Sequence, residues 1–394
     1  MLRTCATGPH RATVGAMTGV GLDRPVRIAH LATRLIIAGM GNVVASLVRE
    51  ASEERCHQSI WCLEEADTLG QILRGEGHSV VELGRRHRRD FGLFVRIARS
   101  IRQNKIDVLH CHDELAWFYG VIGGLLGGVP AILVTMHGRR QTFSSRHLWE
   151  QRLLARLSSR VVCVSKYLGQ QILSELGTSP NKVVTIRNGI DLSLPQSSLH
   201  ARSKIRLELG LQDSAFVVGA VGRLDAVKNF DLLFETIGDA RSVVPSLRLV
   251  LVGEGPCRDH LLQKRSQLGL EDCVVMTGLR RDIPDLLASF DLYVCSSDYE
   301  GISLSILEAM AARTAVVATA VGGNVELVSH DHTGVLVKPK HVREMVAAIV
   351  DLSRDSQRRI QLGRQARSFV EQHFSLPQMI EEYDRLYHAV LTDQ

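Results

Sequence analysis

The 394-residue sequence lacks any apolar run long enough to cross a membrane, and aromatic residues make up only 5% of it. A membrane-spanning helix needs about 20 consecutive apolar residues, so we predict none. The first 25 residues contain Arg3 and Arg11 but no Leu-rich segment, which is not the pattern of a secretory signal peptide. We therefore interpret residues 1–25 as a disordered extension, or as the product of a start codon placed too early.

Paired cysteines are also missing. The eight cysteines include no Cys-x-x-Cys spacing, and Cys111, Cys163 and Cys295 fall in apolar, strand-like runs. Buried free thiols in a reducing cytoplasm explain this pattern better than disulfides or a zinc site. The formal net charge of +5 is modest, so we expect no nucleic-acid partner. These features indicate a cytoplasmic globular protein.

Two cofactor motifs are absent from the sequence. There is no intact Gly-x-Gly-x-x-Gly turn with a following acid, which argues against a dehydrogenase. The glycine-rich segment 120–128 lies within an apolar helical stretch, where close helix packing explains it better. No Asp-x-Asp motif stands between the predicted strands. We therefore expect neither a bound metal nor a cofactor.

The sequence does contain a regular alternation of apolar strand runs and helical patterns. This alternation predicts an α/β protein with mostly parallel sheets, and the length predicts two domains. Residues 192–201, with Pro195 and three serines, are expected to link them. Helices are expected at residues 342–352, 357–371 and 377–391. The expected strands are residues 26–31, 58–61, 79–82, 108–111, 131–135, 161–164 and 183–186, followed by 215–221, 247–252, 274–276, 292–295, 315–318 and 334–337.

The most informative stretch follows the expected strand 292–295. Glu300 and Gly301 form a polar turn, and a helix is expected to begin near Ser303. The free N–H groups of a first helical turn bind anions, and Gly301 leaves room for a phosphate. Glu300 and Glu308, on either side of this helix end, can each accept the hydroxyl protons of a sugar. The stretch predicts a site for a nucleotide diphosphate sugar, with two solvated carboxylates as the alternative.

Two cations lie in an earlier strand-to-helix loop. Arg223 and Lys228 follow the expected strand 215–221, and a helix begins near Asn229. They can hold a diphosphate, Arg through its planar fork and Lys as a point charge. The next expected strand also ends in a tight loop, which starts at Gly253.

Three features of the first half point to a second side of the site. Residues 36–42 are expected to form the loop into a helix at 43–49, and glycines there either admit a ligand or only make the turn. His110 and His112 lie on one face of a strand end because strand side chains alternate. A structural pair explains them better than metal ligands, since further ligands are missing. His137 follows the fifth strand at the edge where parallel sheets bind ligands.

A basic segment separates the third and fourth strands. Residues 85–89 contain four arginines, and the amphipathic helix after them carries Arg96, Arg99 and Arg102. These charges form either a solvated face or a patch for lipid phosphates.

Together these residues resemble the retaining glycosyltransferases of family four, which have the GT-B architecture of two Rossmann-like domains facing each other across a cleft. The resemblance extends from about residue 26 to the C-terminus. Its most specific element is the pair Glu300 and Glu308, which continues as Glu-Ala-Met-Ala. The other matches, in the family's order, are His112, His137-Gly138, Ser165, Asn188 to Asp191, Gly222-Arg223-Leu224 with Lys228, Gly253 with Gly255-Pro256, Gly278 with Asp282, and Gly322-Gly323 with Glu326.

The resemblance implies how the chain is divided. Residues 1–25 would be a disordered extension, residues 26–195 an acceptor domain and residues 196–375 a nucleotide-sugar donor domain. The last helix, in residues 376–394, would pack back on the N-terminal domain.

The resemblance also implies roles for single residues. Arg223 and Lys228 would bind the donor diphosphate and neutralise the leaving group. Glu308 would hold the ribose hydroxyls, and Glu300 those of the transferred sugar. His137 would lie near that sugar from the opposite domain, which completes the implied catalytic set. Further contacts are implied for the helix start (Gly301, Ile302, Ser303, Leu304), the base edge (Leu279, Arg280), the Gly253 loop, and the acceptor side (Gly39, Met40, Gly41, His112).

The sequence departs from the family at two places. The acceptor loop reads Ala-Gly-Met-Gly-Asn over residues 38–42, where the family often has Gly-Gly-x-Glu, so the acid is missing. Arg313 stands where the family usually has glycine, which affects a helix C-cap at a cost of about 1 kcal/mol.

The resulting hypothesis is a retaining, metal-independent glycosyltransferase without a cofactor. It would use a UDP- or GDP-sugar and a glycan or lipid-linked acceptor, in surface polysaccharide or glycolipid biosynthesis. The basic segment favours peripheral contact with the inner membrane face. The alternatives are a GT-B sugar-nucleotide epimerase or hydrolase, and a non-catalytic glycosyltransferase-like partner in a polysaccharide assembly. The sequence does not place the hydrogen bonds that select the sugar, the base or the acceptor.

Overall fold

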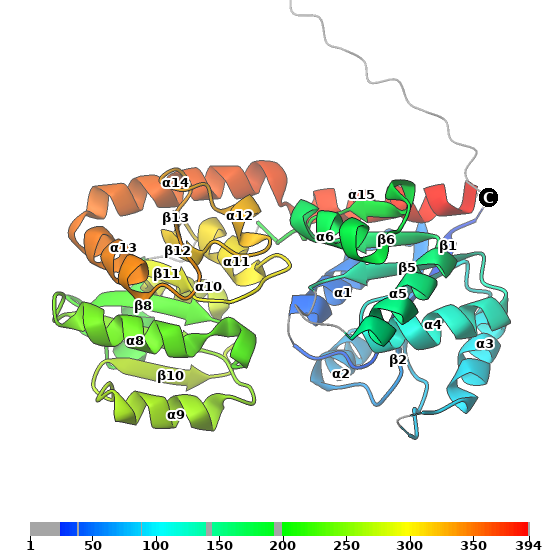
Figure 1. Cartoon of the computed structure of the whole chain (residues 1–394), viewed down its shortest axis with the longest axis horizontal. Coiled ribbons are helices and arrows are strands. Elements are labelled where there is room, and N and C mark those ends of the chain that lie inside the picture. Colours follow the sequence, from blue (N-terminus) through cyan, green and yellow to red (C-terminus); the bar gives the residue numbers. More distant parts are fainter. Residues whose placement is uncertain (1–23, 38, 88, 139–143, 193–198, 393–394) are drawn as a thin grey trace, which may run out of the picture.

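The computed structural model describes residues 24–37, 39–87, 89–138, 144–192 and 199–392, which form two lobes side by side (Figure 1). Of the expected extension 1–25, residues 1–23 lie outside the described part. Arg24 pairs with Asp107, with 2.7 Å between Nη2 and Oδ1. None of the described helices has both the length and the apolar content needed to cross a membrane.

The N-terminal lobe is built on a sheet of seven strands in the order β3-β2-β1-β4-β5-β6-β7. All of its strand pairs are parallel. The chain turns from β1 outward in both directions, so the topological switch point lies between β1 and β4. The strands are β1 (Val26–Ala32), β2 (Cys56–Cys62), β3 (Val80–Glu82), β4 (Val108–Cys111), β5 (Ala131–Met136), β6 (Arg160–Cys163) and β7 (Val183–Thr185).

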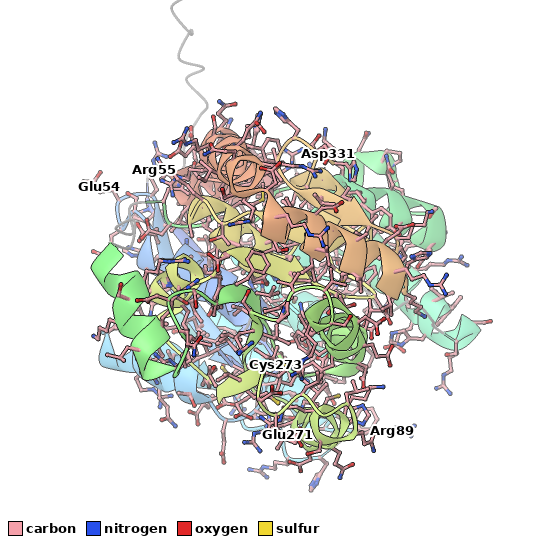
Figure 2. All side chains as sticks on the ribbon, turned by 90° about the vertical axis from the view of Figure 1, so that its left-hand side faces the viewer. Glu54, Arg55, Arg89, Glu271, Cys273 and Asp331 are labelled. Atoms are coloured by element: carbon pink, nitrogen blue, oxygen red, sulfur yellow. The ribbon has the colours of Figure 1, made fainter. Side chains whose placement is uncertain are left out.

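The C-terminal lobe repeats this plan with six parallel strands in the order β10-β9-β8-β11-β12-β13. Its switch point lies between β8 and β11. Figure 2 shows Asp331, which precedes β13, near the top of this lobe and Cys273, just before β10, in its lower half, which agrees with β10 and β13 as the two edge strands. The strands are β8 (Phe216–Val221), β9 (Leu247–Val252), β10 (Val274–Gly278), β11 (Leu292–Cys295), β12 (Val316–Thr319) and β13 (Val335–Val337).

Helices connect the strands and cover the sheets, so central strands such as β5 and β11 are buried at every position. The first lobe contains α1 (Gly39–Arg49), α2 (Thr68–Gly75), α3 (Gly92–Asn104), α4 (Glu114–Gly127), α5 (Ser145–Leu157), α6 (Lys166–Leu176) and the 3-10 turn η1 (Pro180–Lys182). The second contains α7 (Leu199–Glu208), η2 (Ala226–Lys228), α8 (Phe230–Arg241), α9 (Arg258–Gln267), α10 (Ile283–Ser289), α11 (Leu304–Ala311), α12 (Asn324–Leu327), α13 (Val342–Arg354) and α14 (Ser356–His373).

The last helix, α15 (Leu376–Thr392), crosses from the second lobe to the first (Figure 1). Its buried tyrosines Tyr383 and Tyr387 share a hydrophobic cluster with Val26 and Ile28 of β1. The chain enters this helix beside Ile190, whose backbone pairs with that of Ser375. The C-terminal helix therefore belongs to the core of the N-terminal lobe.

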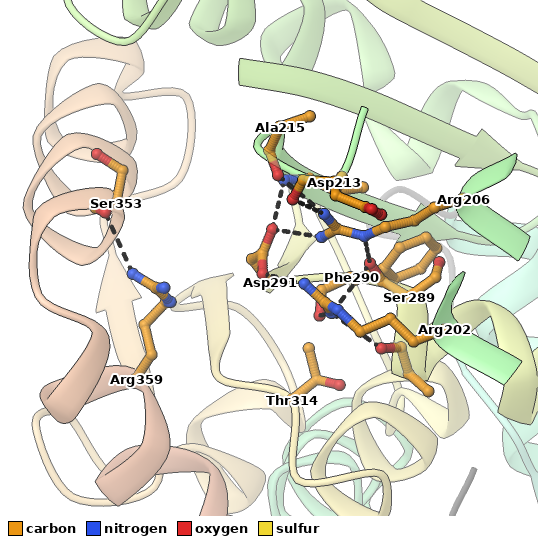
Figure 3. Close-up of polar contacts among 12 residues, drawn as sticks. Arg202, Arg206, Asp213, Ala215, Ser289, Phe290, Asp291, Thr314, Ser353 and Arg359 are labelled. Atoms are coloured by element: carbon orange, nitrogen blue, oxygen red, sulfur yellow. Dashed lines mark hydrogen bonds and ion pairs between the residues drawn. The ribbon is translucent and has the colours of Figure 1, made fainter. Parts of the chain in front are cut away.

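Two arginines of α7 fix the start of β11. Arg202 and Arg206 donate to the two carboxylate oxygens of Asp291, at 2.6 and 2.7 Å (Figure 3). Arg206 is almost fully buried and also donates to the carbonyl of Ala215, just before β8. Charge-assisted bonds of this kind are short and directional, so they hold together the amino ends of the two strands that flank the switch point.

Two expected connecting segments, residues 36–42 and 192–201, contain helix. α1 begins at Gly39, so residues 39–42 of the expected loop form its first turn. The expectation followed the low helix propensity of glycine, but a Cβ at Gly41 would lie 2.0 Å from the carbonyl oxygen of Ile36. Close packing at the helix start therefore outweighs the low helix propensity of glycine. α7 begins at Leu199, inside the expected linker 192–201, of which residues 193–198 lie outside the described part.

Candidate functional site

The switch point of the C-terminal lobe brings two loops together. The loop after β8 carries Lys228 in η2, and the loop after β11 carries Asp298 and Glu300. Ser296 donates from Oγ to the carbonyl of Lys228 at 2.9 Å, and Asn229 donates from its amide to Asp298 at 2.8 Å. These bonds hold the two loops side by side.

Lys228 and Glu300 form an ion pair with 2.6 Å between Nζ and Oε1. Glu300 is 8% exposed, so the pair is largely shielded from water. Burial alone would lower the pKa of Lys228, but the Glu300 carboxylate raises it above its ordinary value. Lys228 therefore stays charged at the site over the whole physiological pH range.

Glu300 has partners that the sequence reasoning missed. Ser297 donates from Oγ to Oε1 at 2.6 Å, and the thiol of Cys295 lies 3.9 Å from the same oxygen. The sequence signal that could have indicated Ser297 is its position between the end of β11 and Glu300. All these contacts converge on Oε1, so this half of the carboxylate is held in place while Oε2 has no assigned partner among the described residues.

The start of α11 lies directly after this pair. The Oγ of Ser303 accepts from the N–H of Ile306 and caps the helix. The N–H groups of Ile302, Ser303 and Leu304 donate to no acceptor in the described part of the chain. This helix end is therefore free to bind an anion.

The two lobes touch at Gly301. A Cβ at this position would lie 2.1 Å from the carbonyl oxygen of His137, so the glycine is needed for the approach of the lobes. Across the same junction, Gly39 at the start of α1 faces Leu304, since a Cβ at Gly39 would lie 3.9 Å from Leu304 Cδ1. The starts of α1 and α11 thus face each other.

Glu308 lies in the second turn of α11. It is partly buried, its carboxylate has no hydrogen-bond partner among the described residues, and burial raises its pKa to about 7. A side chain that is desolvated without a partner is destabilising in the free protein, which is typical of a group kept for a ligand.

The remaining donor-side residues lie at the rim of the C-terminal lobe. The side chain of Arg223 is 52% exposed and lies 3.4 Å from Asp225. Leu279 is exposed, whereas Arg280 forms ion pairs with Asp282 and Glu208. The Arg280 side chain is therefore occupied, and its backbone is the part still available for a ligand.

The neighbours of Gly253 explain why this position is a glycine. A Cβ there would lie 1.9 Å from the carbonyl oxygen of Gly222, and its φ is +145°. Its N–H donates to the carbonyl of Gly278 at 2.9 Å. The loops after β8, β9 and β10 therefore pack backbone against backbone, and only glycine fits at the contact.

The N-terminal lobe contributes His137 and His112. His112 is 2% exposed, and its Nδ1 lies 3.3 Å from Nε2 of His137. The Nδ1 of His137 is buried, and no described residue forms a hydrogen bond with it. His112 thus lies behind His137. Gly39, Met40 and Gly41 form the first turn of α1, which faces Leu304.

A second contact between the lobes was not expected from the sequence. Glu326 accepts from the N–H groups of Lys166 and Tyr167 at the start of α6, at 3.2 and 2.7 Å. A carboxylate at a helix N-terminus is stabilised by the helix dipole. Tyr299 adds a weaker bond to Gln171 of the same helix, at 3.4 Å. Glu326 and Tyr299 are far in sequence from their partners on α6, so only the fold brings these residues together.

With this geometry in view, two family models match the sequence. Residues 37–194 match Glycosyltransferase Family 4, and residues 215–355 match Glycosyl transferases group 1. The chain belongs to the family-four glycosyltransferases. The expected enzyme class is thereby confirmed.

Relatives of this glycosyltransferase span most of its length. It is 24% identical over 375 residues to the Escherichia coli UDP-Gal:alpha-D-GlcNAc-diphosphoundecaprenol alpha-1,3-galactosyltransferase, with 92% of this chain and 96% of that protein covered. It is 26% identical over 310 residues to the Bacillus anthracis N-acetyl-alpha-D-glucosaminyl L-malate synthase, with 77% and 80% covered.

Solved structures share the fold of this glycosyltransferase. Anabaena Alr3699/HepE in complex with UDP and glucose superimposes with a TM-score of 0.84 at 23% identity, over 92% of this chain and 99% of that chain. WaaG, a glycosyltransferase involved in lipopolysaccharide biosynthesis, gives 0.73 at 14% identity, over 91% and 99%. The expected GT-B architecture of two Rossmann-like domains is confirmed.

Proposed function

We propose that this glycosyltransferase moves a sugar from a UDP- or GDP-sugar to a hydroxyl of a glycan or lipid-linked acceptor, with retention at the anomeric carbon and without a metal ion. The observation that carries the proposal is the arrangement at the start of α11. There the ion pair of Lys228 and Glu300 lies beside three N–H groups and the Glu308 carboxylate, none of which has a hydrogen-bond partner among the described residues.

Each part of a nucleotide diphosphate sugar has a matching group. The diphosphate suits the N–H groups at the start of α11 together with Lys228 and Arg223. The ribose hydroxyls suit the partnerless carboxylate of Glu308. The free oxygen of Glu300 suits the hydroxyls of the transferred sugar, and the exposed edge at Leu279 and Arg280 suits the base.

Similar proteins support a nucleotide sugar as the donor. The Escherichia coli relative uses UDP-Gal, as its name states. Anabaena Alr3699/HepE, which shares the fold, was also solved in complex with UDP-glucose, with a TM-score of 0.81 at 22% identity over 93% of this chain and 100% of that chain. A UDP-sugar is therefore the first donor to test, with GDP-sugars second.

The proposed step breaks the bond between the anomeric carbon and the diphosphate oxygen. The acceptor hydroxyl forms its new bond to that carbon from the same face, and its proton passes to the departing phosphate oxygen. The products are a glycoside and a nucleoside diphosphate. Negative charge grows on the leaving diphosphate, where Arg223, Lys228 and the start of α11 stabilise it. These groups supply the charge that a metal ion supplies in other transferases, which supports metal independence.

A groove on the N-terminal lobe supports a lipid-linked acceptor. It has a volume of about 1080 Å³. Its lining includes Phe91, Phe94, Phe118, Arg89 and Arg146. Aromatic rings suit a polyprenyl chain, and two guanidinium groups suit its phosphates. The relative that acts on a diphosphoundecaprenol-linked sugar supports the same acceptor class.

Exposed apolar side chains on the same lobe support contact with a membrane surface. Phe91 at the start of α3 is 73% exposed and Trp149 on α5 is 65% exposed. Arg86 and Arg89 are exposed beside them, and Figure 2 shows Arg89 at the outline of the molecule. Arg85 differs, because it forms an ion pair with Glu64 at 2.7 Å. Aromatic and basic side chains together favour an anionic bilayer surface.

The donor proposal is tested by calorimetry with UDP-glucose and GDP-mannose. Lys228→Ala should weaken binding, since it removes the positive charge that is proposed to contact the diphosphate. Arg223→Ala should lower turnover more than binding because it acts on the developing charge. Arg343→Ala, an exposed arginine on α13, is the matched control and should change neither. Unchanged affinity in Lys228→Ala would refute the proposed donor site.

The products decide between transfer and its alternatives. A glycoside whose anomeric configuration equals that of the donor supports retention, and inversion would contradict it. Full activity after chelation with EDTA supports metal independence. Nucleotide release with no glycoside for any acceptor would instead indicate an epimerase or a hydrolase.

The membrane proposal has its own test. Sedimentation with anionic vesicles should recover the wild type and lose Phe91→Ser, while the control Leu207→Ser, exposed on the other lobe, should still bind. Equal binding of all three proteins to neutral and anionic vesicles would refute it.

A further inference from the structure

Four polar side chains form a row across adjacent strands of the N-terminal sheet. Gln58 lies on β2 and His30 on β1, whereas His112 and His137 directly follow β4 and β5. These strands are neighbours in the sheet order. The row therefore runs from β2 to the junction with Gly301.

Each member of the row is hydrogen-bonded to the next. Gln58 Oε1 lies 2.8 Å from His30 Nε2, and His30 Nδ1 lies 2.9 Å from His112 Nε2. His112 Nδ1 lies 3.3 Å from His137 Nε2. The row ends at His137 Nδ1, which is buried and has no hydrogen-bond partner among the described residues.

The three buried histidines His30, His110 and His112 lie close enough to hold a metal ion, with ligand atoms within 4.8 Å of one another. Their ring nitrogens are already bonded, however. Both nitrogens of His30 and His112 belong to the row, and those of His110 contact the hydroxyls of Tyr387 and Thr135 at 2.9 and 2.7 Å. A metal would have to break these bonds, so hydrogen bonding is the better explanation of the cluster.

The imidazoles of the row are neutral at physiological pH. Burial lowers the pKa of His30 and His137 to about 4, and burial together with the neighbouring imidazoles holds the pKa of His112 well below its ordinary value. A neutral imidazole has one N–H donor and one acceptor nitrogen. Setting one tautomer at the start of such a row therefore sets all of them.

The amide oxygen of Gln58 sets this direction because it can only accept. His30 must then carry its proton on Nε2 and accept at Nδ1, and His112 must in turn donate from Nε2. His112 Nδ1 is left as an acceptor for the Nε2–H of His137. The proton of His137 is thus on Nε2, and its free Nδ1 is an acceptor.

We propose that this row fixes the tautomer of His137, so that its Nδ1 accepts a hydrogen bond from a hydroxyl of the transferred sugar. Gln58, His30 and His112 are positioning residues in this scheme, and only His137 touches the substrate. The inference rests on the proposed function, since it needs the sugar between His137 and Glu300. The contact between the His137 carbonyl and Gly301, the residue after Glu300, places the backbone of His137 beside that position.

The tautomer is measured directly by NMR on protein labelled with 15N-histidine, because a protonated ring nitrogen differs in chemical shift from an unprotonated one. The signal of His137 is assigned by its loss in His137→Asn. The proposal predicts a proton on Nε2 and none on Nδ1, in the free protein and with UDP-glucose bound. A proton on Nδ1 would overturn it, because His137 would then present a donor.

Two variants of Gln58 distinguish a role in fixing the tautomer of His137 from a role in packing alone. Gln58→Glu keeps an accepting oxygen and should retain the tautomer and kcat/KM within about twofold. Gln58→Met has a similar size but cannot accept, so it should mix the tautomers and lower kcat/KM about tenfold, the effect of one lost hydrogen bond. A purely structural role predicts the reverse order, since Met is tolerated in a core more easily than Glu. Equal kcat/KM in both variants, or a larger loss in Gln58→Glu, would overturn the proposal.

Binding of UDP alone distinguishes this inference from the proposed function. UDP lacks the transferred sugar, so its affinity should be equal in wild type and Gln58→Met, and a lower affinity in Gln58→Met would contradict the inference. If the wild type transfers sugar and Gln58→Met is fully active, only the inference fails. If the wild type binds no nucleotide sugar, the proposed function fails, and the tautomer measurement still decides whether the row fixes His137.

Discussion

The binding of a nucleotide sugar should depend on pH through Glu308. Its pKa is raised to about 7 by burial, and a ribose needs the ionised form, whose two oxygens both accept. If only the ionised form binds, the apparent dissociation constant rises with the protonated fraction. Lowering the pH from about 8.5 to about 5.5 should then weaken binding about 30-fold, or about 2 kcal/mol.

UDP-glucose is the suitable ligand for this titration. The terminal phosphate of UDP itself titrates near pH 6, whereas the diphosphate of UDP-glucose has no such group. His137, with a pKa of about 4, stays neutral throughout, and Lys228 stays charged because Glu300 raises its pKa. Calorimetry at several pH values therefore isolates Glu308.

The matched control is Glu308→Gln, which should bind UDP-glucose more weakly at pH 8.5 but with no pH dependence in this range. The same substitution should stabilise the free protein. The folded pKa of Glu308 lies above its ordinary value of 4.5, so its destabilising effect is absent below pH 4.5 and complete above about pH 7. Glu308→Gln should therefore raise the free energy of unfolding by about 3 kcal/mol at pH 8.5. A wild-type affinity independent of pH, or the same pH slope in Glu308→Gln, would refute the assignment of Glu308 to the ribose.

Three further predictions concern stability. Arg313 has a φ of +60° just after α11, so Arg313→Gly should raise the free energy of unfolding by about 1 kcal/mol in urea denaturation. A lower free energy of unfolding in Arg313→Gly would mean that the contacts of the Arg313 side chain outweigh the strain in its backbone. Lys228→Met leaves the carboxylate of Glu300 buried without its cation and should lower the free energy of unfolding by about 3 kcal/mol, whereas adding Glu300→Gln should recover part of it. Below pH 6.5 the unfolded chain binds a proton that buried His30, with a folded pKa of about 4, does not bind, so His30 alone should lower the free energy of unfolding by about 3 kcal/mol between pH 6.5 and pH 4. In His30→Gln that fall should be smaller, and an equal fall would exclude His30 as a cause.

The elements of the fold could be predicted because their signals are local. The expected strands 108–111, 247–252 and 292–295 coincide with β4, β9 and β11, since buried parallel strands are short apolar runs between polar turns. The start of α1 could not be predicted in this way. Its first-turn glycines oppose a helix by propensity, and the packing of Gly41 on Ile36 appears only in three dimensions.

The candidate site could be predicted in part, for the same reason. The turn with Glu300 and the loop with Lys228 have local signals, and the fold places them in contact. The use of Gly301 as a contact between the lobes, the bond of Glu326 to the start of α6, and the row that ends at His137 join residues far apart in the sequence. No single segment indicates such contacts. The roles of these residues towards a ligand stay predictions.

A crystal structure with UDP-glucose bound tests the central claim most directly. The diphosphate should lie on the N–H groups of Ile302 to Leu304, within reach of Lys228 and Arg223, and the ribose hydroxyls should donate to Glu308. A ligand bound elsewhere on the C-terminal lobe, or a diphosphate that contacts neither the start of α11 nor Lys228, would contradict it.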